Sequence, residues 1–377
     1  MTLYLVVLLS VLSSIAQRGS KVTVSLYALE LGAGSFAVGL IAALFATFPL
    51  VLAVQAGRIS DRFGIRYPMF LGGTTMALAL AAPAVFPQLN TLFACAALMG
   101  LGHIFFHVSV HNLVGALGGA DRARNFATFS LGSSIAAFIG PSAAGFAIEY
   151  AGFRPALLLL AALPLASGLA VLALRPQPVH REAEEEAKSA FDLLAIPALR
   201  RTLIMSGVAL TGIELFSFYL PIYGRSIGLA PSVIGMVLSC YAVAGFLVRS
   251  FMHRLARRYT EIGVLTASLF LAAATYALLP ALHEAVLLAM AAFALGLALG
   301  SAQPLTIILT YNHAPKGRSG EALGMRIMAN KVTQIAVPLA FGGLGAAMGS
   351  VPVFLATGAF LFVAGLLSLK SEKRQNQ

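Results

Sequence analysis

Apolar runs of about 20 residues follow one another along this whole chain, and charge is confined to short stretches between them. A helix of that length crosses a bilayer because its backbone satisfies its own hydrogen bonds where no water is present. The chain is 59% hydrophobic and 10% charged, whereas a soluble domain is about 25% charged. We therefore expect an all-α membrane protein with twelve transmembrane helices, at residues 3–29, 36–57, 67–86, 91–113, 125–149, 154–174, 201–223, 231–252, 262–280, 285–311, 321–346 and 352–370.

Lysine and arginine fall on alternate sides of these runs. If the N-terminus lies inside, eighteen of them occupy inner segments and only Arg154 and Arg225 occupy outer loops. Basic residues gather in short cytoplasmic loops, so the pattern predicts a multi-pass protein of the plasma (inner) membrane with both termini in the cytoplasm. The net charge of +11 then reflects orientation, and we expect no nucleic acid partner. The first run lacks the basic start of a signal peptide, so we interpret it as a transmembrane helix.

The longest polar stretch, residues 175–200, divides the chain into halves. It has a proline-rich start, an acidic run and an amphipathic tail. This composition predicts a cytoplasmic linker with a short interfacial helix.

The two halves repeat each other. A shift of 196 residues places Tyr27 on Tyr223 and Gly100 on Gly296. Six spans followed by six spans in parallel orientation indicate two bundles that meet at a central site. We therefore expect a 6+6 pseudo-symmetric fold with an N-terminal six-helix bundle at residues 1–174 and a C-terminal one at residues 201–377.

The stretch "GRISDRFGIR", residues 57–66, concentrates charge between the second and third runs. Its landmarks are Gly57, Asp61, Arg62, Gly64 and Arg66. They match the G-x-x-x-D-R-x-G-x-[RK] signature between helices 2 and 3 of the major facilitator superfamily, and they stand at the family's position. With its twelve spans and half-chain repeat, essentially the whole chain resembles this superfamily. The resemblance implies a secondary transporter that works by alternating access.

The resemblance also implies that Asp61 acts in a conformational latch. In family structures this aspartate abuts the cytoplasmic N-terminus of helix 11, here residues 321–346. An acid at a helix N-terminus contributes about 0.3–1 kcal/mol. The contact exists only when the halves are closed on the inside, so it favours the outward-open state. Gly57 and Gly64 would permit a tight turn and close helix approach, whereas Arg66 is also explained as an ordinary basic loop residue.

The second copy of this stretch departs from the signature. Arg257 stands where Asp61 stands in the first copy, and Thr260 stands where Gly64 does. The latch is therefore expected to be asymmetric.

Polar residues in the first run mark candidate substrate-binding positions, because a charge at bilayer depth costs about 2.5–3.5 kcal/mol. At 100° per residue they share one arc; they are Ser10, Ser13, Ser14, Gln17, Arg18, Lys21 and Ser25. Helix 1 lines the central cavity in the family, so the resemblance implies that Gln17, Arg18 and Lys21 face substrate. A structural polar seam against a neighbouring helix is the alternative.

Glu214 in the seventh run is the repeat mate of Arg18. Helices 1 and 7 face each other across the cavity in the family, so the resemblance implies that the two side chains approach each other. Burial disfavours a charged carboxylate and a nearby cation favours it. Glu214 is therefore a candidate proton-coupling acid, and a static ion pair is the alternative.

The eleventh run carries Arg326, Asn330 and Lys331 on or beside one face. Similar R-x-x-x-N patterns occur in this helix of related exporters. Arg326 lies a turn or two inside the predicted cytoplasmic end, so it is a candidate ligand or a candidate gate residue.

The fourth run carries His103, His107 and His111 on one face. This spacing could bind a metal, relay protons, contact an anion or serve ordinary packing. Acidic and cysteine ligands are not nearby in sequence, so we expect no metal site. His107 is the best candidate for a substrate or proton role, because its repeat mate Gln303 is also polar.

The fifth run contains "LGSSIAAFIGPSAAG", residues 131–145. Gly140, Pro141 and Gly145 match the exporter-associated motif that ends G-P-x-x-G-G, while Ala136 and Ala144 replace expected glycines. Such a helix packs closely and bends at its proline. The resemblance favours export.

The chain lacks the phosphate loop of ATPases, the G-x-S-x-G elbow and the H-E-x-x-H motif. We therefore expect neither an enzyme nor a cofactor. The excess of positive charge at membrane depth fits a small organic anion or zwitterion. We expect a monomer in the bilayer that exports an anionic or amphipathic metabolite and is coupled to protons. The alternative is a broad-specificity proton-driven multidrug exporter, whose apolar pocket would be supplied by Phe105, Phe106, Phe216 and Phe218.

Overall fold

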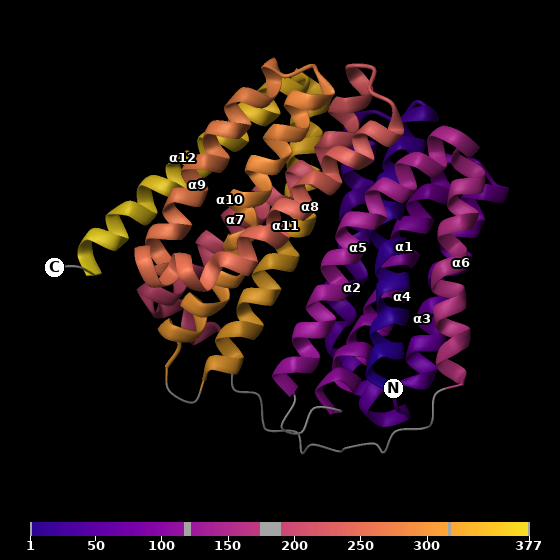
Figure 1. Ribbon diagram of the computed structural model, residues 1–377, viewed down its shortest axis with the longest axis horizontal. Coiled ribbons are helices and arrows are strands. Elements are labelled where there is room, and N and C mark those ends of the chain that lie inside the picture. The colour runs from indigo at the N-terminus through magenta and orange to yellow at the C-terminus, as the bar shows by residue number, and fades with distance from the viewer. Residues whose placement is uncertain (1, 117–121, 174–189, 316–317, 376–377) are drawn as a thin grey trace. The chain divides into compact units, whose positions relative to one another are not determined.

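The computed structural model describes residues 2–116, 122–173, 190–315 and 318–375, and within these ranges it is helical with no strand. Six long helices precede the linker (Figure 1): α1 (Thr2–Glu30), α2 (Ser35–Phe63), α3 (Arg66–Val85), α4 (Leu89–Ala116), α5 (Arg122–Ala151) and α6 (Phe153–Leu172). Six follow it: α7 (Pro197–Ser226), α8 (Pro231–Tyr259), α9 (Glu261–Leu278), α10 (Ala285–His313), α11 (Ser319–Met348) and α12 (Ser350–Gln375). Two short 3₁₀ helices, η2 (Ala190–Ala195) and η3 (Leu279–Ala281), complete the described elements.

Each long helix coincides with one predicted run, and the largest differences lie at the ends of α2 and α8. The predicted spans end at residues 57 and 252, but the helices continue to Phe63 and Tyr259. Charged residues end the apolar run from which a span is predicted, but they do not end the helix, because arginine is a good helix former. The predicted loop between α2 and α3 is therefore one tight turn.

Eleven helices among the described residues are long and apolar enough to cross a membrane. The all-α membrane fold is thus confirmed. The remaining predicted span, the eleventh (residues 321–346), lies in α11, which is as long as its neighbours but is not among these eleven helices. Its polar residues lower its hydropathy, so α11 as a spanning helix remains a prediction from the repeat and the resemblance.

The chain divides into two compact units. Unit 1 comprises Met1–Glu184 and Gly224–Ser239, and unit 2 comprises Glu185–Tyr223 and Cys240–Gln377. The N-terminal part of α8 therefore belongs to unit 1. The acidic part of the linker lies outside the described residues, and the bundle boundaries at 174 and 201 stay predictions.

In unit 1, α3 packs on α4 and α6, α2 packs on α4, and α1 packs on α5 and α6. Glycines allow the closest of these approaches. A Cβ atom at Gly72 would lie 2.6 Å from the carbonyl oxygen of Gly102, and one at Gly102 would lie 2.6 Å from that of Gly72. The backbones of α3 and α4 are therefore in direct contact, as small residues permit in membrane helices.

The second half of α5 crosses the N-terminal part of α8 at similarly short range. A Cβ atom at Gly145 would lie 2.3 Å from the carbonyl oxygen of Pro231. In the reciprocal contact, a Cβ atom at Gly235 would lie 2.3 Å from the carbonyl oxygen of Pro141. Each glycine thus faces the carbonyl oxygen of the residue one helical turn before the other glycine. Neither position has room for a side chain.

Polar contacts accompany this crossing. The hydroxyl oxygens of Ser142 and Ser239 lie 2.6 Å apart, and Ser239 donates to the carbonyl oxygen of Phe138 at 2.6 Å. Near the α8 N-terminus, Oε2 of Glu149 accepts from the backbone N–H of Ser232 at 3.2 Å. An acid at that end also interacts favourably with the helix dipole.

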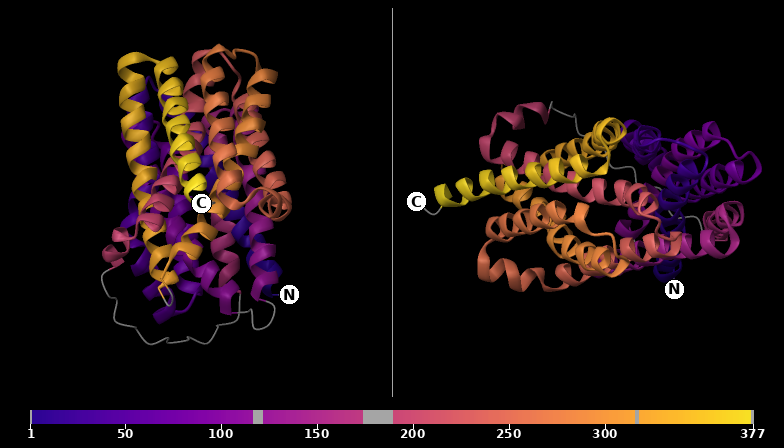
Figure 2. Two further views of the ribbon diagram at one scale, coloured as in Figure 1. Left: turned by 90° about the vertical axis from the view of Figure 1, so that its left-hand side faces the viewer. Right: turned by 90° about the horizontal axis from the view of Figure 1, so that it is seen from above.

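In unit 2, α9 packs on α10 and α12, and α11 packs on α10 and α12. Figure 2 shows these long helices running side by side. Phe354 of α12 lies among three tyrosine rings, those of Tyr219, Tyr223 and Tyr276. The hydroxyl of Tyr276 donates to the carbonyl oxygen of Gly212 at 2.5 Å, so this apolar group also ties α9 to α7.

Backbone geometry confirms the repeat. Among the described residues six have positive φ, and they form three pairs: Gly32 with Gly228, Gly64 with Thr260, and Gly152 with Gly349. Members of the first two pairs are 196 positions apart and those of the third are 197 apart. The same turns therefore recur in both halves at the predicted shift.

Thr260 keeps this turn without the glycine that suits it. Its φ of 63° and ψ of 155° lie in a region that is essentially reserved for glycine, so the strain is about 1–3 kcal/mol. Its Oγ1 partly compensates by accepting from the backbone N–H of Gly263 at 3.1 Å.

We expect Thr260→Gly to raise the melting temperature of the purified protein. The change removes the strain, and replacing an N-cap threonine by glycine costs only a few tenths of a kcal/mol. The net gain is about 1 kcal/mol. Thr260→Ala keeps the strain and loses the cap, so it should lower the melting temperature. Equal destabilisation by both substitutions would contradict the strain assignment.

Candidate functional site

Arg326 of α11 is a buried cation held by neutral oxygens of α10. Only 5% of its surface is exposed. Its Nη2 lies 2.5 Å from Oε1 of Gln303, 3.1 Å from that residue's carbonyl oxygen and 3.0 Å from Oγ1 of Thr306. Its Nε lies 3.3 Å from the same threonine hydroxyl. Within the described part of the chain, no carboxylate forms an ion pair with it.

Further along α11, Gln334 bridges a carboxylate and a cation. Its Nε2 donates to Oε1 of Glu214 on α7 at 3.1 Å. Its Oε1 accepts from Nζ of Lys331 at 3.0 Å. Glu214 is therefore linked through one side chain to a cation within unit 2. The sequence alone did not reveal this bridging role of Gln334.

Asn330 lies between these two groups. Its Oδ1 accepts from the hydroxyl of Ser206 on α7 at 3.0 Å. The candidates Gln303, Arg326, Asn330, Lys331 and Glu214 thus fall into one polar seam of unit 2, where α11 faces α10 and α7.

The candidates of α1 lie in unit 1. Arg18 is exposed, Lys21 is half-buried and Gln17 is largely buried. Among the described residues, Oε1 of Gln17 has no hydrogen-bond partner. The predicted approach of Arg18 to Glu214 would join the two units, and it stays a prediction.

The helix-5 motif explains how α1 and α5 approach each other. A Cβ atom at Gly140 would lie 2.9 Å from Cβ of Arg18 and 3.2 Å from the backbone nitrogen of Gly19. Pro141 lies inside α5, next to the close contact. The missing side chain of Gly140 therefore allows α5 to approach α1 directly at Arg18.

The three histidine rings of α4 form a stack in the loose sense of a row, in which each ring is tilted against the next. The centroids of His103 and His107 are 5.0 Å apart, and those of His107 and His111 are 4.2 Å apart. Phe129 of α5 packs edge-on against His111 at 4.7 Å. In the described ranges no group of three His, Cys, Asp or Glu side chains is arranged to hold a metal ion. The stack is compatible with packing and with proton transfer.

The signature at residues 57–66 has a structural part that the geometry explains. Gly64 ends α2 with φ of 74° and ψ of 174°, which requires glycine. Arg66 donates from Nη2 to the carbonyl oxygen of Leu172, the last residue of α6. This contact caps α6, so Arg66 is more than a basic loop residue. Gly57 lies within α2, where no described atom would come within 4 Å of a Cβ atom. The turn therefore depends on Gly64 alone.

The latch itself stays a prediction. The side chain of Asp61 lies outside the described side chains, and Arg62 is exposed. The expected partner, the N-terminus of α11, belongs to unit 2.

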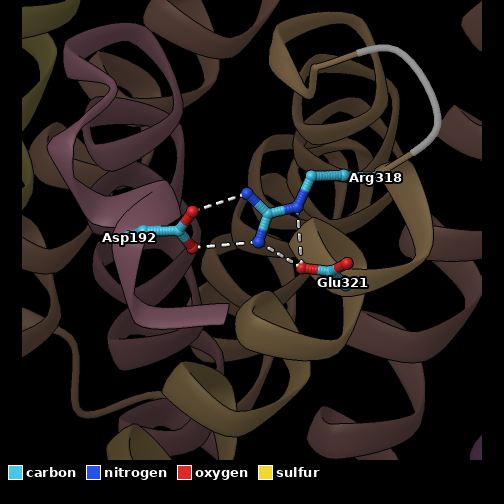
Figure 3. A network of polar contacts seen from close by, with 3 residues as sticks. All are labelled: Asp192, Arg318 and Glu321. Atoms are coloured by element: carbon cyan, nitrogen blue, oxygen red, sulfur yellow. Dashed lines mark hydrogen bonds and ion pairs between the residues drawn. The ribbon is translucent and has the colours of Figure 1, made fainter. Parts of the chain in front are cut away.

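An ion-pair network that the sequence did not reveal holds η2 against the start of α11 (Figure 3). Arg318 donates to both carboxylate oxygens of Asp192, at 2.6 Å from Nη1 and 2.9 Å from Nη2. It also contacts Glu321, whose Oε2 lies 2.9 Å from Nε. Beneath the network, Leu193 is buried against α7 and α11, next to Met325. The amphipathic tail of the linker predicted a short interfacial helix. The structure has the 3₁₀ helix η2 at this place, and the face on which it packs depends on the tertiary fold.

We expect Asp192→Asn to loosen η2. The hydrogen bonds from Arg318 lower the pKa of the Asp192 carboxyl below its ordinary value of 3.8. A lowered pKa in the folded state means that the contribution is present above the unfolded-state pKa and is lost as pH falls through the folded-state pKa. The effect is small because the Asp192 side chain is solvent-exposed and that of Arg318 is partly exposed.

The readout is hydrogen exchange of the Ile196 amide, which donates to the carbonyl oxygen of Leu193. Exchange should be faster in Asp192→Asn than in the wild type at pH 7, and the two rates should converge as the pH falls through the lowered pKa of Asp192. A difference that persists in acid would contradict the ion-pair role.

The profile of the Major Facilitator Superfamily matches residues 6–229 and 202–377, which is nearly the whole chain.

The chain belongs to the Major Facilitator Superfamily.

Relatives and solved structures agree with this assignment. Multidrug resistance protein 1 of Bacillus subtilis (strain 168) is 24% identical over 334 residues, which cover 87% of this chain and 85% of that protein. The crystal structure of a mutant of the nucleoside transporter NupG has a TM-score of 0.84 at 15% identity, with 98% of this chain and 99% of that chain covered. A mutant of the peptide transporter POT in complex with sulfate has a TM-score of 0.80 at 16% identity, with 99% and 94% covered. At these identities the structures show the shared fold.

As a Major Facilitator Superfamily member, the protein is a membrane transporter of small molecules and not an enzyme. The superfamily fold also explains the position of the polar seam. It lies on α7, α10 and α11, whose repeat mates are α1, α4 and α5. Those three helices of unit 1 carry the other candidates, so each half contributes equivalent positions.

Proposed function

We propose that this transporter exports small organic anions, carboxylated or amphipathic metabolites, in exchange for protons. It does so as a monomer in the plasma (inner) membrane, with both termini and the linker in the cytoplasm, by alternating access between two six-helix bundles. Export is supported by the helix-5 resemblance, and the Bacillus relative is a multidrug resistance protein.

The balance of charge inside the apolar helices carries the proposal. Arg249 belongs with the basic cluster at the predicted cytoplasmic end of α8; even without it, Arg18, Lys21, Arg326 and Lys331 outnumber the mid-membrane acid Glu214. Cations at membrane depth are costly, so their excess needs a compensating anion for at least part of the cycle. A negatively charged solute supplies that compensation.

Glu214 is the proposed coupling acid. It is linked to Lys331 through Gln334. The family resemblance implies that Arg18 lies opposite it. A carboxylate whose neighbouring cations move or bind substrate changes its affinity for a proton, which couples proton movement to the occupancy of the site.

The multidrug alternative has one observation in its favour, the name of the Bacillus relative. The aromatic pocket expected for it has less support. Phe106, Phe216 and Phe218 are each at most 5% exposed and are used in helix packing, whereas Phe105 is half-buried.

Proteoliposomes under an imposed pH gradient test the two functions. We expect gradient-driven movement of radiolabelled benzoate or succinate that a protonophore abolishes, with no movement of the cation tetraphenylphosphonium. Protein-free liposomes are the control. Movement of the cation without either anion would favour the multidrug function, and movement of none of the three would contradict both.

The latch completes the proposal. Asp61 at the N-terminus of α11 would hold the inner side closed, so Asp61 belongs to the conformational cycle and not to substrate binding.

A further inference from the structure

The contacts of Arg326 leave its charge uncompensated. It is 95% buried, since only 5% of its surface is exposed, and every partner it has among the described residues is a neutral oxygen of Gln303 or Thr306. Breaking or omitting the partner of a buried charge is strongly destabilising. A guanidinium kept in this state therefore needs a counter-ion that the described chain does not supply.

Two hydrogen-bond donors of this Arg326–Gln303 pair are unused by the contacts given above. A guanidinium carries five N–H bonds. The four contacts of Arg326 use Nε and Nη2, and none of them uses Nη1. The carboxamide of Gln303 gives its Oε1 to Arg326, while its Nε2 is buried with no hydrogen-bond partner in the described structure. An unsatisfied buried donor costs about 1–3 kcal/mol.

A purely structural tie between α10 and α11 does not account for both observations. Such a tie would be satisfied by neutral side chains at lower cost, because a buried ion without a counter-ion loses its hydration and gains little in return. The tie also gives no acceptor to Nε2 of Gln303. Both costs are removed together by one ligand that is negatively charged and has two acceptor oxygens.

We propose that Arg326 and Gln303 bind a carboxylate group of the transported solute. This inference rests on the proposed anion transport and assigns its anion subsite to α10 and α11 of unit 2. One carboxylate oxygen accepts a charge-assisted hydrogen bond from Nη1 of Arg326, and the other accepts from Nε2 of Gln303.

Asn330 extends the donor side of this subsite by one helical turn. Its Oδ1 is occupied by the hydroxyl of Ser206, which leaves the Nδ2 side of the amide as a donor. The unused groups of the subsite are thus donors, which favours an acceptor, and a cationic solute would be repelled by the positive charge of Arg326.

Thermal unfolding of the purified full-length protein tests the subsite. Benzoate, succinate and inorganic sulfate are titrated at constant ionic strength. The variants are Arg326→Gln, Arg326→Lys and the control Arg249→Gln, an arginine of α8 that also donates to a carbonyl oxygen of α10, that of Gly300 at 2.9 Å.

We expect benzoate or succinate to raise the melting temperature of the wild type. In Arg326→Gln, the anion concentration that gives half of the maximal rise in melting temperature should be at least about tenfold higher. A tenfold loss of affinity is about 1.4 kcal/mol of binding free energy. Arg326→Lys keeps the charge without the planar fork, so it should fall between them. Arg249→Gln should resemble the wild type. Without ligand, Arg326→Gln should melt at or above the wild-type temperature, because it removes an uncompensated buried charge.

Equal anion affinity of the wild type and Arg326→Gln would overturn the inference, and so would a wild type that none of the three anions stabilises. Stabilisation by sulfate but by neither carboxylate would overturn the carboxylate assignment. A ligand-free Arg326→Gln that melts well below the wild type would show a structural tie. Binding is measured without flux, so a wild type that binds benzoate through Arg326 but does not transport it would contradict only the proposed function.

Discussion

Glu214→Gln is expected to abolish anion transport driven by a pH gradient while exchange at equal pH continues. Glutamine keeps the shape of the side chain and the acceptor oxygen that receives Nε2 of Gln334 at 3.1 Å. It cannot take up or release a proton, so it mimics one protonation state permanently. The polar seam should therefore form normally, and only the step that depends on the proton should be lost.

The measurement compares two modes in the same proteoliposomes. Gradient-driven accumulation of radiolabelled benzoate or succinate should fall to the level of protein-free liposomes, and exchange at equal pH should retain the wild-type order of magnitude. Glu284→Gln is the matched control, because Glu284 is an exposed carboxylate at the N-cap of α10. Gradient-driven accumulation in Glu214→Gln would rule this residue out, and His107 would be tested next.

Gly145→Ala and Gly235→Ala are each expected to suppress the close α5–α8 crossing and to reduce transport severely. The added methyl group would lie 2.3 Å from a carbonyl oxygen of the partner helix, and a backbone atom cannot move aside as a flexible side chain can. Overpacking of this kind costs about 1–3 kcal/mol. An energy of that size lowers the population of the crossed arrangement by about 5- to 150-fold.

Disulfide formation reports this crossing directly. In a background without Cys95 and Cys240, cysteines at Ser142 and Ser239 replace hydroxyls that lie 2.6 Å apart. They should cross-link rapidly with the native glycines and slowly with either alanine. Gly324→Ala is the control, since no described atom would lie within 4 Å of its Cβ atom. Unchanged cross-linking in both glycine variants would contradict the steric argument.

The sequence predicted the helices well, because the signal for them is local. A span needs about 20 apolar residues and nothing else, so each run identifies its helix without reference to the others. The repeat was equally accessible. A shift of 196 aligns Gly64 with Thr260, and the structure gives both the same unusual backbone conformation.

The ends of α2 and α8 were predicted less well for a physical reason. Hydropathy locates the edge of the membrane, whereas the end of a helix depends on backbone conformation. Arg62 and Phe63 leave the apolar run but continue the helix, and only Gly64 ends it. Hydropathy also leaves α11 uncounted among the spans, because Arg326, Lys331 and Gln334 interrupt its apolar character.

The sequence by itself determined the class of the protein, its repeat and which polar residues stand inside apolar helices, because the bilayer penalises every buried charge and so makes each exception visible. It did not determine how those residues pair. Arg326 meets Gln303 and Thr306, Gln334 joins Glu214 to Lys331, and Arg318 reaches Asp192. These contacts depend on how each helix is rotated and shifted along its axis against its neighbours. Close contacts at glycines, such as Gly300 of α10, determine that rotation and shift. Lys331 and Gln334 are only 3 positions apart in the sequence, but Arg318 and Asp192 are 126 apart. Only the tertiary structure brings such distant residues together.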